Sequence, residues 1–284
     1  MAGPTTQSKP LAVISGGAGQ LALTCAERLY GWRVLLSDRR ADGMDAAAAR
    51  LAEKGIEATT HVADITRRQD AEALAAAAAE MGEFGALLHT AGVAPPTAPE
   101  VIYAVNLFGT INLLEAFEPL VQPGVVGVCV ASIAGHRQAA RRWDDLLADP
   151  NDDPASLAER IEAAAPGLSK PRLAYAASKR GAILQVERRA HAWGRRGGRL
   201  LSVSPGVVAD TAMGLQRQAA QGDKGEASPR LVNSAEIADA VAFAVWPGAT
   251  GLNGVDLLVD AGYLAAVNHQ FDPVRRTQWH AIEI

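Results

Sequence analysis

The sequence predicts an α/β protein with a doubly wound, seven-stranded parallel sheet and helices on both faces. Short apolar runs alternate with longer, alanine-rich amphipathic runs, the pattern of strands joined by crossover helices. Hydrophobic residues make up 49% of the 284 residues, which is enough for a large core. The alternation continues without a linker, so we expect a single domain over residues 1–284.

Seven short apolar runs are the predicted strands, and they cover residues 11–15, 33–37, 58–62, 86–89, 125–131, 199–203 and 254–259. The longer runs between them are predicted helices, at about residues 19–30, 44–54, 67–81, 100–117, 174–193 and 234–245. Two segments interrupt the alternation. Residues 136–172 are charged and rich in proline, and contain a predicted short helix over 155–165 with Ser156 and Glu159 as a capping box. Residues 209–234 are polar and contain three glycines, which suits a mobile substrate loop.

Composition limits the class of protein. The formal net charge of −4 does not favour nucleic acid as a partner, and the six histidines have no metal-like spacing. Cys25 and Cys129 lie in apolar runs and are interpreted as buried thiols in a reducing compartment. The first ten residues do not resemble a signal peptide, and no stretch approaches 18 uninterrupted apolar residues. We therefore expect a cytoplasmic protein that does not bind a membrane.

A glycine-rich turn follows the first predicted strand. Gly16, Gly17 and Gly19 allow the backbone to turn tightly and to approach a pyrophosphate, and Gln20 and Leu21 then open a helix with free N–H groups. The spacing is Gly-x-x-Gly-x-x-Ala instead of Gly-x-Gly-x-x-Gly. A glycine turn at this place also serves purely structural loops, so the motif alone predicts a nucleotide site only weakly.

Three other strand ends fit a dinucleotide. Asp38 ends the second strand, where a carboxylate accepts hydrogen bonds from ribose hydroxyls and repels a 2′-phosphate, so we expect NAD in preference to NADP. Arg39 and Arg40 argue against this preference, because paired guanidiniums can bind a 2′-phosphate and leave NADP open. Asp64, followed by Ile65, could face the adenine or cap the next helix. Small residues at the end of the fourth strand would let a ribose lie against the backbone, namely Ala91 and Gly92.

Tyr175 and Lys179 are four residues apart in a predicted helix and therefore project from one face. A fixed ammonium beside a phenol favours the phenolate and lowers a phenol pKa that is otherwise about 10. This pair can move a proton to or from an alcohol while a bound cofactor moves a hydride. An isolated tyrosine on a helix is more often a packing residue, so the interpretation depends on the accompanying motifs.

Taken in order, the motifs resemble those of the short-chain dehydrogenase/reductase family over nearly all of residues 11–263. The matching residues are Ser15 to Gly19, Asp64, Thr90 to Gly92, Asn106, Ser132, Tyr175, Lys179, Pro205, Gly206 and Val259 to Gly262. The resemblance implies a Rossmann-type fold and NAD(P)-dependent oxidation or reduction of a secondary alcohol or ketone.

The resemblance also implies roles for individual residues. Tyr175 would be the acid or base, Lys179 would hold the nicotinamide ribose, and Ser132 would bond the substrate oxygen. Asn106 would hold a water molecule that links Lys179 to solvent. The segment Pro205, Gly206 and Val207 would contact the nicotinamide amide, with Thr211 as the nearest hydroxyl because Asp210 occupies the family's usual threonine position.

The chain departs from the family pattern in two further respects. His89 and Thr90 stand where two asparagines are usual, so the hydrogen bonds that tie the central strands should differ. Ser132 and Tyr175 are also much further apart than usual, which makes residues 136–172 an insertion. Bacterial 3α-hydroxysteroid dehydrogenase/carbonyl reductases carry a similar insertion, which blocks one family interface, and this implies a homodimer acting on a small-molecule alcohol or ketone.

Two other functions remain open. A dinucleotide-sensing regulatory protein would bind NAD(P) without chemistry, but it would be expected to lose Tyr175 or Lys179. The glycine spacing also suggests a nucleotide-sugar epimerase or dehydratase, although the chain after the sixth strand is short for a sugar-binding lobe. The sequence does not identify the substrate.

Overall fold

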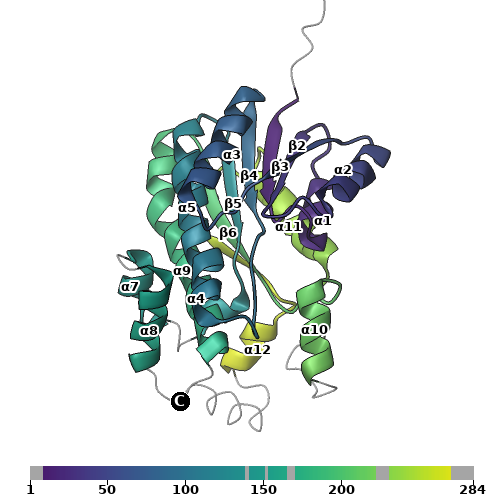
Figure 1. Ribbon diagram of the computed structural model, residues 1–284. Helices are drawn as coiled ribbons and strands as arrows, with labels where there is room; N and C mark the ends of the chain where they lie inside the picture. The colour runs from purple at the N-terminus through teal and green to yellow at the C-terminus, as the bar shows by residue number, and fades with distance from the viewer. Residues whose placement is uncertain (1–8, 138–140, 151–152, 165–169, 222–229, 270–284) are drawn as a thin grey trace, which may run out of the picture.

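Seven parallel strands form one sheet in the computed structural model, which describes residues 9–137, 141–150, 153–164, 170–221 and 230–269 (Figure 1). The strand order is β3-β2-β1-β4-β5-β6-β7, which confirms the predicted doubly wound α/β fold. The strands are β1 Leu11–Ser15, β2 Arg33–Asp38, β3 Glu57–Val62, β4 Phe84–His89, β5 Val126–Val130, β6 Arg199–Pro205 and β7 Asp256–Val259.

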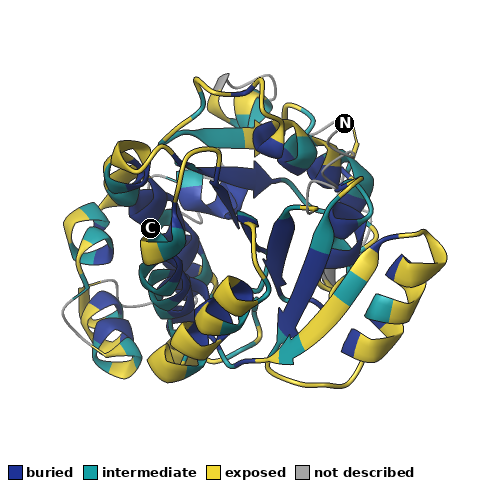
Figure 2. Cartoon of the chain, turned by 90° about the horizontal axis from the view of Figure 1, so that it is seen from above, coloured by how far each residue is buried: buried dark blue, intermediate teal, exposed yellow. Residues whose placement is uncertain are grey.

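Helices follow the strands on both faces. They are α1 Gln20–Ala26, α2 Met44–Glu53, α3 Arg68–Glu80, α4 Pro99–Tyr103, α5 Gly109–Phe117, α7 Asp144–Ala148, α8 Pro154–Ala164, α9 Lys170–Arg195, α10 Ala212–Gln221, α11 Ser234–Val245 and α12 Tyr263–His269. Figure 1 shows α1, α2 and α11 beside one face of the sheet and α3, α5 and α9 beside the other. The central strands are buried, whereas exposed residues lie on the outer sides of the helices, on loops and on the edge strand β3 (Figure 2).

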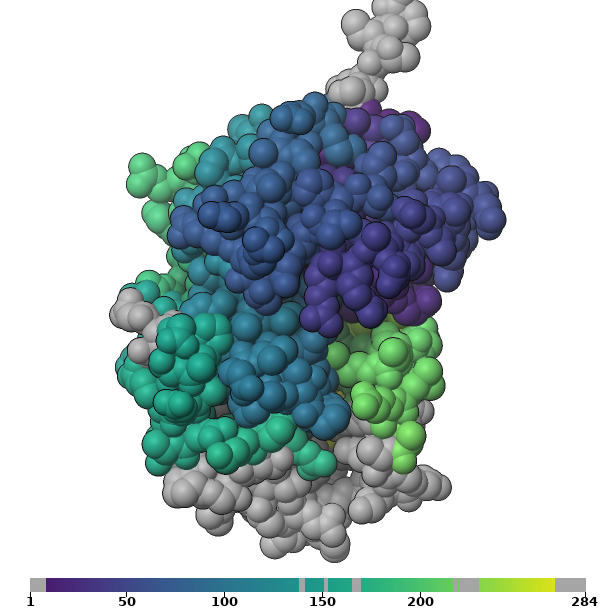
Figure 3. All heavy atoms as spheres, in the orientation of Figure 1, coloured from purple at the N-terminus to yellow at the C-terminus, as the bar shows by residue number. Residues whose placement is uncertain are grey.

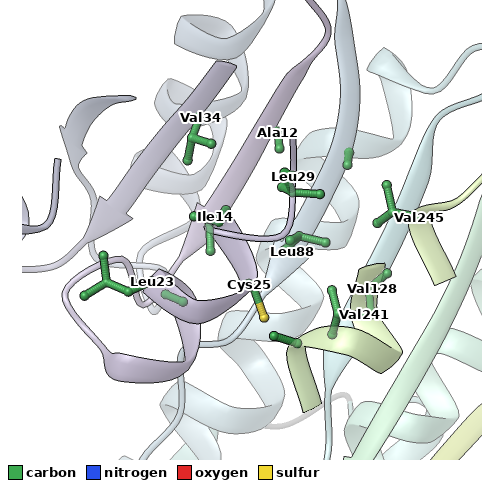
Figure 4. Packing of buried hydrophobic residues seen from close by; sticks show 14 of the residues in the cluster. Ala12, Ile14, Leu23, Cys25, Leu29, Val34, Leu88, Val128, Val241 and Val245 are labelled. Atoms are coloured by element: carbon green, nitrogen blue, oxygen red, sulfur yellow. The ribbon is translucent and has the colours of Figure 1, made fainter. Parts of the chain in front are cut away.

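The core has one apolar layer on each face of the sheet because alternate strand residues point to opposite sides. Ala12 and Ile14 of β1 pack with α1 and α11 on the first face, while Leu11 and Val13 pack with α3, α5 and α9 on the second. Figure 4 shows the first layer, with the Cys25 side chain packed among those of the sheet and α11. Cys25 and Cys129 are both free and buried, and burial raises the pKa of each thiol to about 12.

The strands end at one level, and this positions the site. Ser15 is in register with Ser37 of β2 and with His89 of β4, and His89 is in register with Cys129 of β5. The loops that leave these positions therefore meet at the carboxyl edge of the sheet, where α4, α10 and α12 also gather (Figure 1).

The long helix predicted over 100–117 is interrupted. A π turn at Ala104–Phe108 separates α4 from α5, and it contains Asn106. Single π turns inside helices occur frequently at functional sites. The segment Pro99–Leu120 is also long and apolar enough to cross a membrane, but half of it is buried, and it packs against α3 and α9 in the core.

The described part of the insertion contains α7, which packs on α9, and α8, which packs on α4. Its apolar residues join a third buried cluster with α4 and α9; they include Trp143, Leu147, Leu157 and Ile161. The predicted capping box at Ser156 is wrong. Asp153 caps α8 instead, because its carboxylate accepts hydrogen bonds from the backbone N–H groups of Ala155 and Ser156.

The segment predicted as a mobile loop, 209–234, contains the helix α10. Its two ends are held together by a parallel bridge between Val208 and Val232. Thr211 caps α10, since its Oγ1 accepts a hydrogen bond from the Gly214 N–H at 3.1 Å. Residues 222–229 lie outside the described residues, and the predicted mobility stays a prediction.

Candidate active site

The glycine turn fits tightly between two strand ends. Gly16 has φ +76°, and a Cβ there would lie 2.8 Å from the backbone nitrogen of Ala91. A Cβ at Gly17 would lie 2.9 Å from Cβ of Leu36. Any side chain at either position would therefore push β2 or β4 away. Gly19 begins α1 without a side-chain cap, so the first backbone N–H groups of α1 remain available to a ligand.

A cavity of about 240 Å³ opens beside this turn. Most of the residues predicted for the adenosine half of a dinucleotide line it: Gly16, Gly19, Asp38, Arg39, Asp64, Ile65, Ala91 and Gly92. Asp64 also accepts hydrogen bonds from the backbone and hydroxyl of Thr66, so its carboxylate organises the turn before α3 as well as facing the cavity. Asp38 and Arg39 both line this cavity. The geometry therefore does not decide between NAD, which Asp38 favours, and NADP, which Arg39 favours.

A second cavity, of about 290 Å³, continues from the first. The two share Gly16, Gly19, Thr90 and Gly92, so together they form one crevice along the carboxyl edge of the sheet. The second cavity is lined by the remaining predicted cofactor and catalytic residues except Asn106: Gln20, Leu21, Ser132, Tyr175, Lys179, Pro205, Gly206, Val207 and Thr211. The structure thus brings both halves of the predicted site together.

Ser132 follows β5 at the start of a 3₁₀ turn, Ile133–His136. Its Oγ accepts a hydrogen bond from the backbone N–H of Ala134 at 3.2 Å. A hydroxyl that accepts in this way keeps its own proton available for donation. Ser132 is 9% exposed, so that proton can be donated into the cavity.

Tyr175 and Lys179 are one turn apart on α9 and line the same cavity. Lys179 is buried, and its Nζ donates a hydrogen bond to the backbone carbonyl of Val130 at 2.9 Å. Burial disfavours the ammonium and lowers the pKa of Lys179 to about 8, against a smaller opposing effect from Cys129. The Tyr175 hydroxyl donates to the sulfur of Met213 on α10 at 3.8 Å.

Asn106 does not line either cavity. Its side-chain amide pairs with both backbone groups of Val93, because Oδ1 accepts from the Val93 N–H and Nδ2 donates to the Val93 carbonyl, both at 2.9 Å. Nδ2 also donates to Oγ of Ser178 at 3.2 Å. A Cβ at Gly92 would lie 3.3 Å from both Asn106 Oδ1 and Lys179 Nζ, so these two side chains meet at that glycine. Asn106 therefore ties the loop after β4 to α9.

The loop after β6 is also held by side chains. Asp210 accepts hydrogen bonds from the backbone and hydroxyl of Ser234, so it is turned toward α11 and not into the crevice. Thr211 lines the second cavity, but its hydroxyl donates to the Val208 carbonyl while it caps α10.

Sequence reasoning missed Met213 as a cavity residue. It lies in the segment interpreted as a polar loop, and the helix α10 that carries it was not predicted. The insertion and α10 lie on either side of α4 on the face that Figure 3 shows.

Two family models match the chain: one described as short chain dehydrogenase over residues 10–142, and one described as enoyl-(acyl carrier protein) reductase over residues 161–264. A galactitol 2-dehydrogenase (L-tagatose-forming) from Cereibacter sphaeroides is 32% identical over 273 residues, which cover 89% of this chain and 93% of the relative. A 3-alpha-hydroxysteroid dehydrogenase/carbonyl reductase from Comamonas testosteroni is 30% identical over 186 residues, which cover 62% and 71%. The solved structure of the 3-alpha-hydroxysteroid dehydrogenase from Pseudomonas sp. B-0831, complexed with NADH, has a TM-score of 0.73 at 26% identity and covers 92% of this chain and 99% of that one.

Proposed function

Because the chain belongs to the short-chain dehydrogenase/reductase family, whose enzymes act on CH–OH donors with NAD(P), we propose that it is an NAD(H)-dependent oxidoreductase that interconverts a secondary alcohol and a ketone. One observation carries the proposal: Ser132, Tyr175 and Lys179 line one cavity, and that cavity continues to the glycine turn.

Two features of the crevice support the binding of a dinucleotide. The glycine turn leads into α1, whose first backbone N–H groups have no side-chain cap and would bind the pyrophosphate. Asp38 stands at the adenosine end and Lys179 at the other end, and small residues form the wall between them. When bound, the cofactor would supply or accept the hydride.

In this mechanism the protein supplies the proton and stabilises charge. Tyr175 would protonate the carbonyl oxygen during reduction or take the alcohol proton during oxidation. Lys179, with its pKa lowered to about 8, would hold the nicotinamide ribose and favour the phenolate. Ser132 would donate its proton to the substrate oxygen and stabilise the charge that develops there. Asn106 would keep the loop after β4 fixed against α9.

The substrate would be an uncharged alcohol or ketone of largely apolar character, a class that includes the hydroxysteroids. Lys179 is the one charged residue lining the second cavity among the described residues. Most of the other lining residues are apolar or small, and they include Ile133, Val208 and Met213. A panel of hydroxysteroids, cyclic secondary alcohols, quinones and sugar alcohols, assayed with NAD⁺ and NADH, tests this. Turnover of sugar alcohols alone would overturn the apolar class but not the oxidoreductase.

Asp38 should determine the cofactor preference. Replacing Asp38 with Ser should raise the KM for NAD⁺ by roughly tenfold or more, because a hydrogen bond to a charged group contributes about 1.5–3 kcal/mol. The use of NADP⁺ should improve, since the repulsion of the 2′-phosphate is removed and Arg39 remains. The measurement is kcat/KM with both nucleotides, and Arg39→Ala is the matched control, which should weaken only NADP⁺. Wild-type protein that uses NADPH about tenfold better than NADH would contradict the proposed preference.

We also propose a cytoplasmic homodimer. The insertion helices cover the outer face of α4 and α9, so that face is not available to a partner. Phe243, Trp246 and Leu258 expose apolar side chains on α11 and β7 instead. The molar mass from light scattering tests the dimer, and a tetramer or a monomer would contradict it.

A further inference from the structure

His89, the last residue of β4, lies between the glycine turn and the π turn. Its side chain is 3% exposed. Nδ1 lies 2.7 Å from Oγ of Ser15, which ends β1, and Nε2 lies 2.9 Å from Oγ1 of Thr110 on α5. Thr110 Oγ1 in turn bonds the backbone carbonyl of Asn106 at 2.8 Å. One chain of hydrogen bonds therefore connects the residue before Gly16 to the π turn.

The direction of this chain follows from its last bond. The Asn106 carbonyl can only accept, so Thr110 donates its proton there and must accept from Nε2–H of His89. With the ring neutral, Nδ1 then accepts the Ser15 hydroxyl proton. The ring stays neutral because burial, and to a smaller extent the charge of Lys179, lower the pKa of His89 to about 3. The donor and the acceptor of each hydrogen bond from Ser15 to the Asn106 carbonyl are therefore defined.

Each end of the chain supports a different part of the site. The Ser15 carbonyl accepts from both the backbone and the hydroxyl of Thr90, so Ser15 joins the glycine turn to the cavity wall. At the other end, Asn106 holds Val93 and Ser178, and it meets Lys179 at Gly92. A shorter side chain at position 89, such as the asparagine usual in the family, could not bond Ser15 and Thr110 together.

We propose that His89 is a positioning residue that, as the neutral Nε2–H tautomer, couples the cofactor turn through Ser15 to the Asn106–Lys179 side of the active site through Thr110. This inference rests on the proposed oxidoreductase function for its kinetic test. It predicts that the bond to Ser15 supports cofactor affinity and that the bond to Thr110 supports turnover, so that the two properties can be changed separately.

Two substitutions separate the bonds. His89→Asn places an amide near the position of Nδ1 and keeps the Ser15 bond, whereas His89→Gln places one near Nε2 and keeps the Thr110 bond. We expect His89→Asn to lower kcat by about tenfold or more with NADH affinity nearly unchanged, because small displacements of catalytic groups are costly. We expect His89→Gln to weaken NADH binding by about fivefold with a smaller effect on kcat.

Ser15→Ala and Thr110→Val are the matched controls, since each removes one partner with little change in volume. Ser15→Ala should reproduce the weaker NADH binding of His89→Gln, and Thr110→Val the lower kcat of His89→Asn. Equal losses of both properties in all four variants would show a merely structural role and overturn the proposal, as would no loss in any of them. Unfolding curves identify any variant that does not fold.

A second measurement decides the proposal independently of turnover. In wild-type protein labelled with ¹⁵N-histidine, the His89 ring should show an unprotonated Nδ1 and a protonated Nε2. The opposite tautomer or a protonated ring would overturn the inference. The proposed reaction fails if no substrate is found. The role of His89 at the cofactor turn still stands in that case if the ring has this tautomer and NADH binds more weakly to His89→Gln than to His89→Asn.

Discussion

Replacing Tyr175 with Phe is expected to reduce turnover by roughly 10²–10⁴-fold, the usual contribution of a general acid or base, and to leave NADH binding intact. The substitution removes only the hydroxyl. The ring, which packs against Ala134 and Ala176 and on the third apolar cluster, is retained. The bond of that hydroxyl to the Met213 sulfur is weak, so its loss should cost the fold little.

The measurement combines turnover with a titration of NADH fluorescence on the same preparation. Ser132→Ala is the informative comparison, because it removes the second group that would bond the substrate oxygen while keeping the proton donor. Its turnover should fall as well, by about 10²-fold. Turnover of the Tyr175→Phe protein within a few-fold of wild type would rule out the acid/base role, whereas loss of NADH binding would mean that the tyrosine supports the cofactor.

The strands and the glycine turn could be predicted because their signals are local. Leu11 to Ser15 is an apolar run short enough to be a buried strand, and the glycines that follow are required by backbone sterics. Since parallel strands place their carboxyl ends at one edge, residues such as Asp38 and Ser132 could be placed in one site from the sequence.

Other features could not be predicted because they depend on contacts distant in sequence. The π turn at Asn106 lies inside a run with good helical periodicity. It accompanies hydrogen bonds from the Asn106 side chain to the Val93 backbone and to the Ser178 hydroxyl. Asp210 pairs with Ser234 across the whole α10 segment, so nothing near it in the sequence shows that it faces away from the crevice. The cap of α8 was missed by three residues because Asp153 and Ser156 have similar capping propensities.

Replacing Lys179 with Met should abolish most turnover, by about 10²-fold or more, and at the same time make the protein more stable at pH 7. The lysine is buried, and its folded-state pKa of about 8 lies below the ordinary value of 10.5, which means that burial destabilises the charged form. A shift of this size corresponds to about 3 kcal/mol, from which the unsatisfied Val130 carbonyl left by the substitution subtracts about 1–2 kcal/mol. The free energy of unfolding should therefore rise by roughly 1–2 kcal/mol.

The dependence on pH distinguishes this cause from improved packing. Below pH 8 both the folded and the unfolded wild-type chains carry the proton, so the full cost of burying the ammonium is present. Between pH 8 and 10.5 only the unfolded chain keeps the proton, and the stability of the wild type therefore rises with pH. The advantage of Lys179→Met, measured by urea unfolding without cofactor, should shrink across this window and reverse above it, since the variant lacks the bond to Val130. If the difference in stability between the two proteins stays constant from pH 7 to 10.5, the buried charge of Lys179 is not its cause.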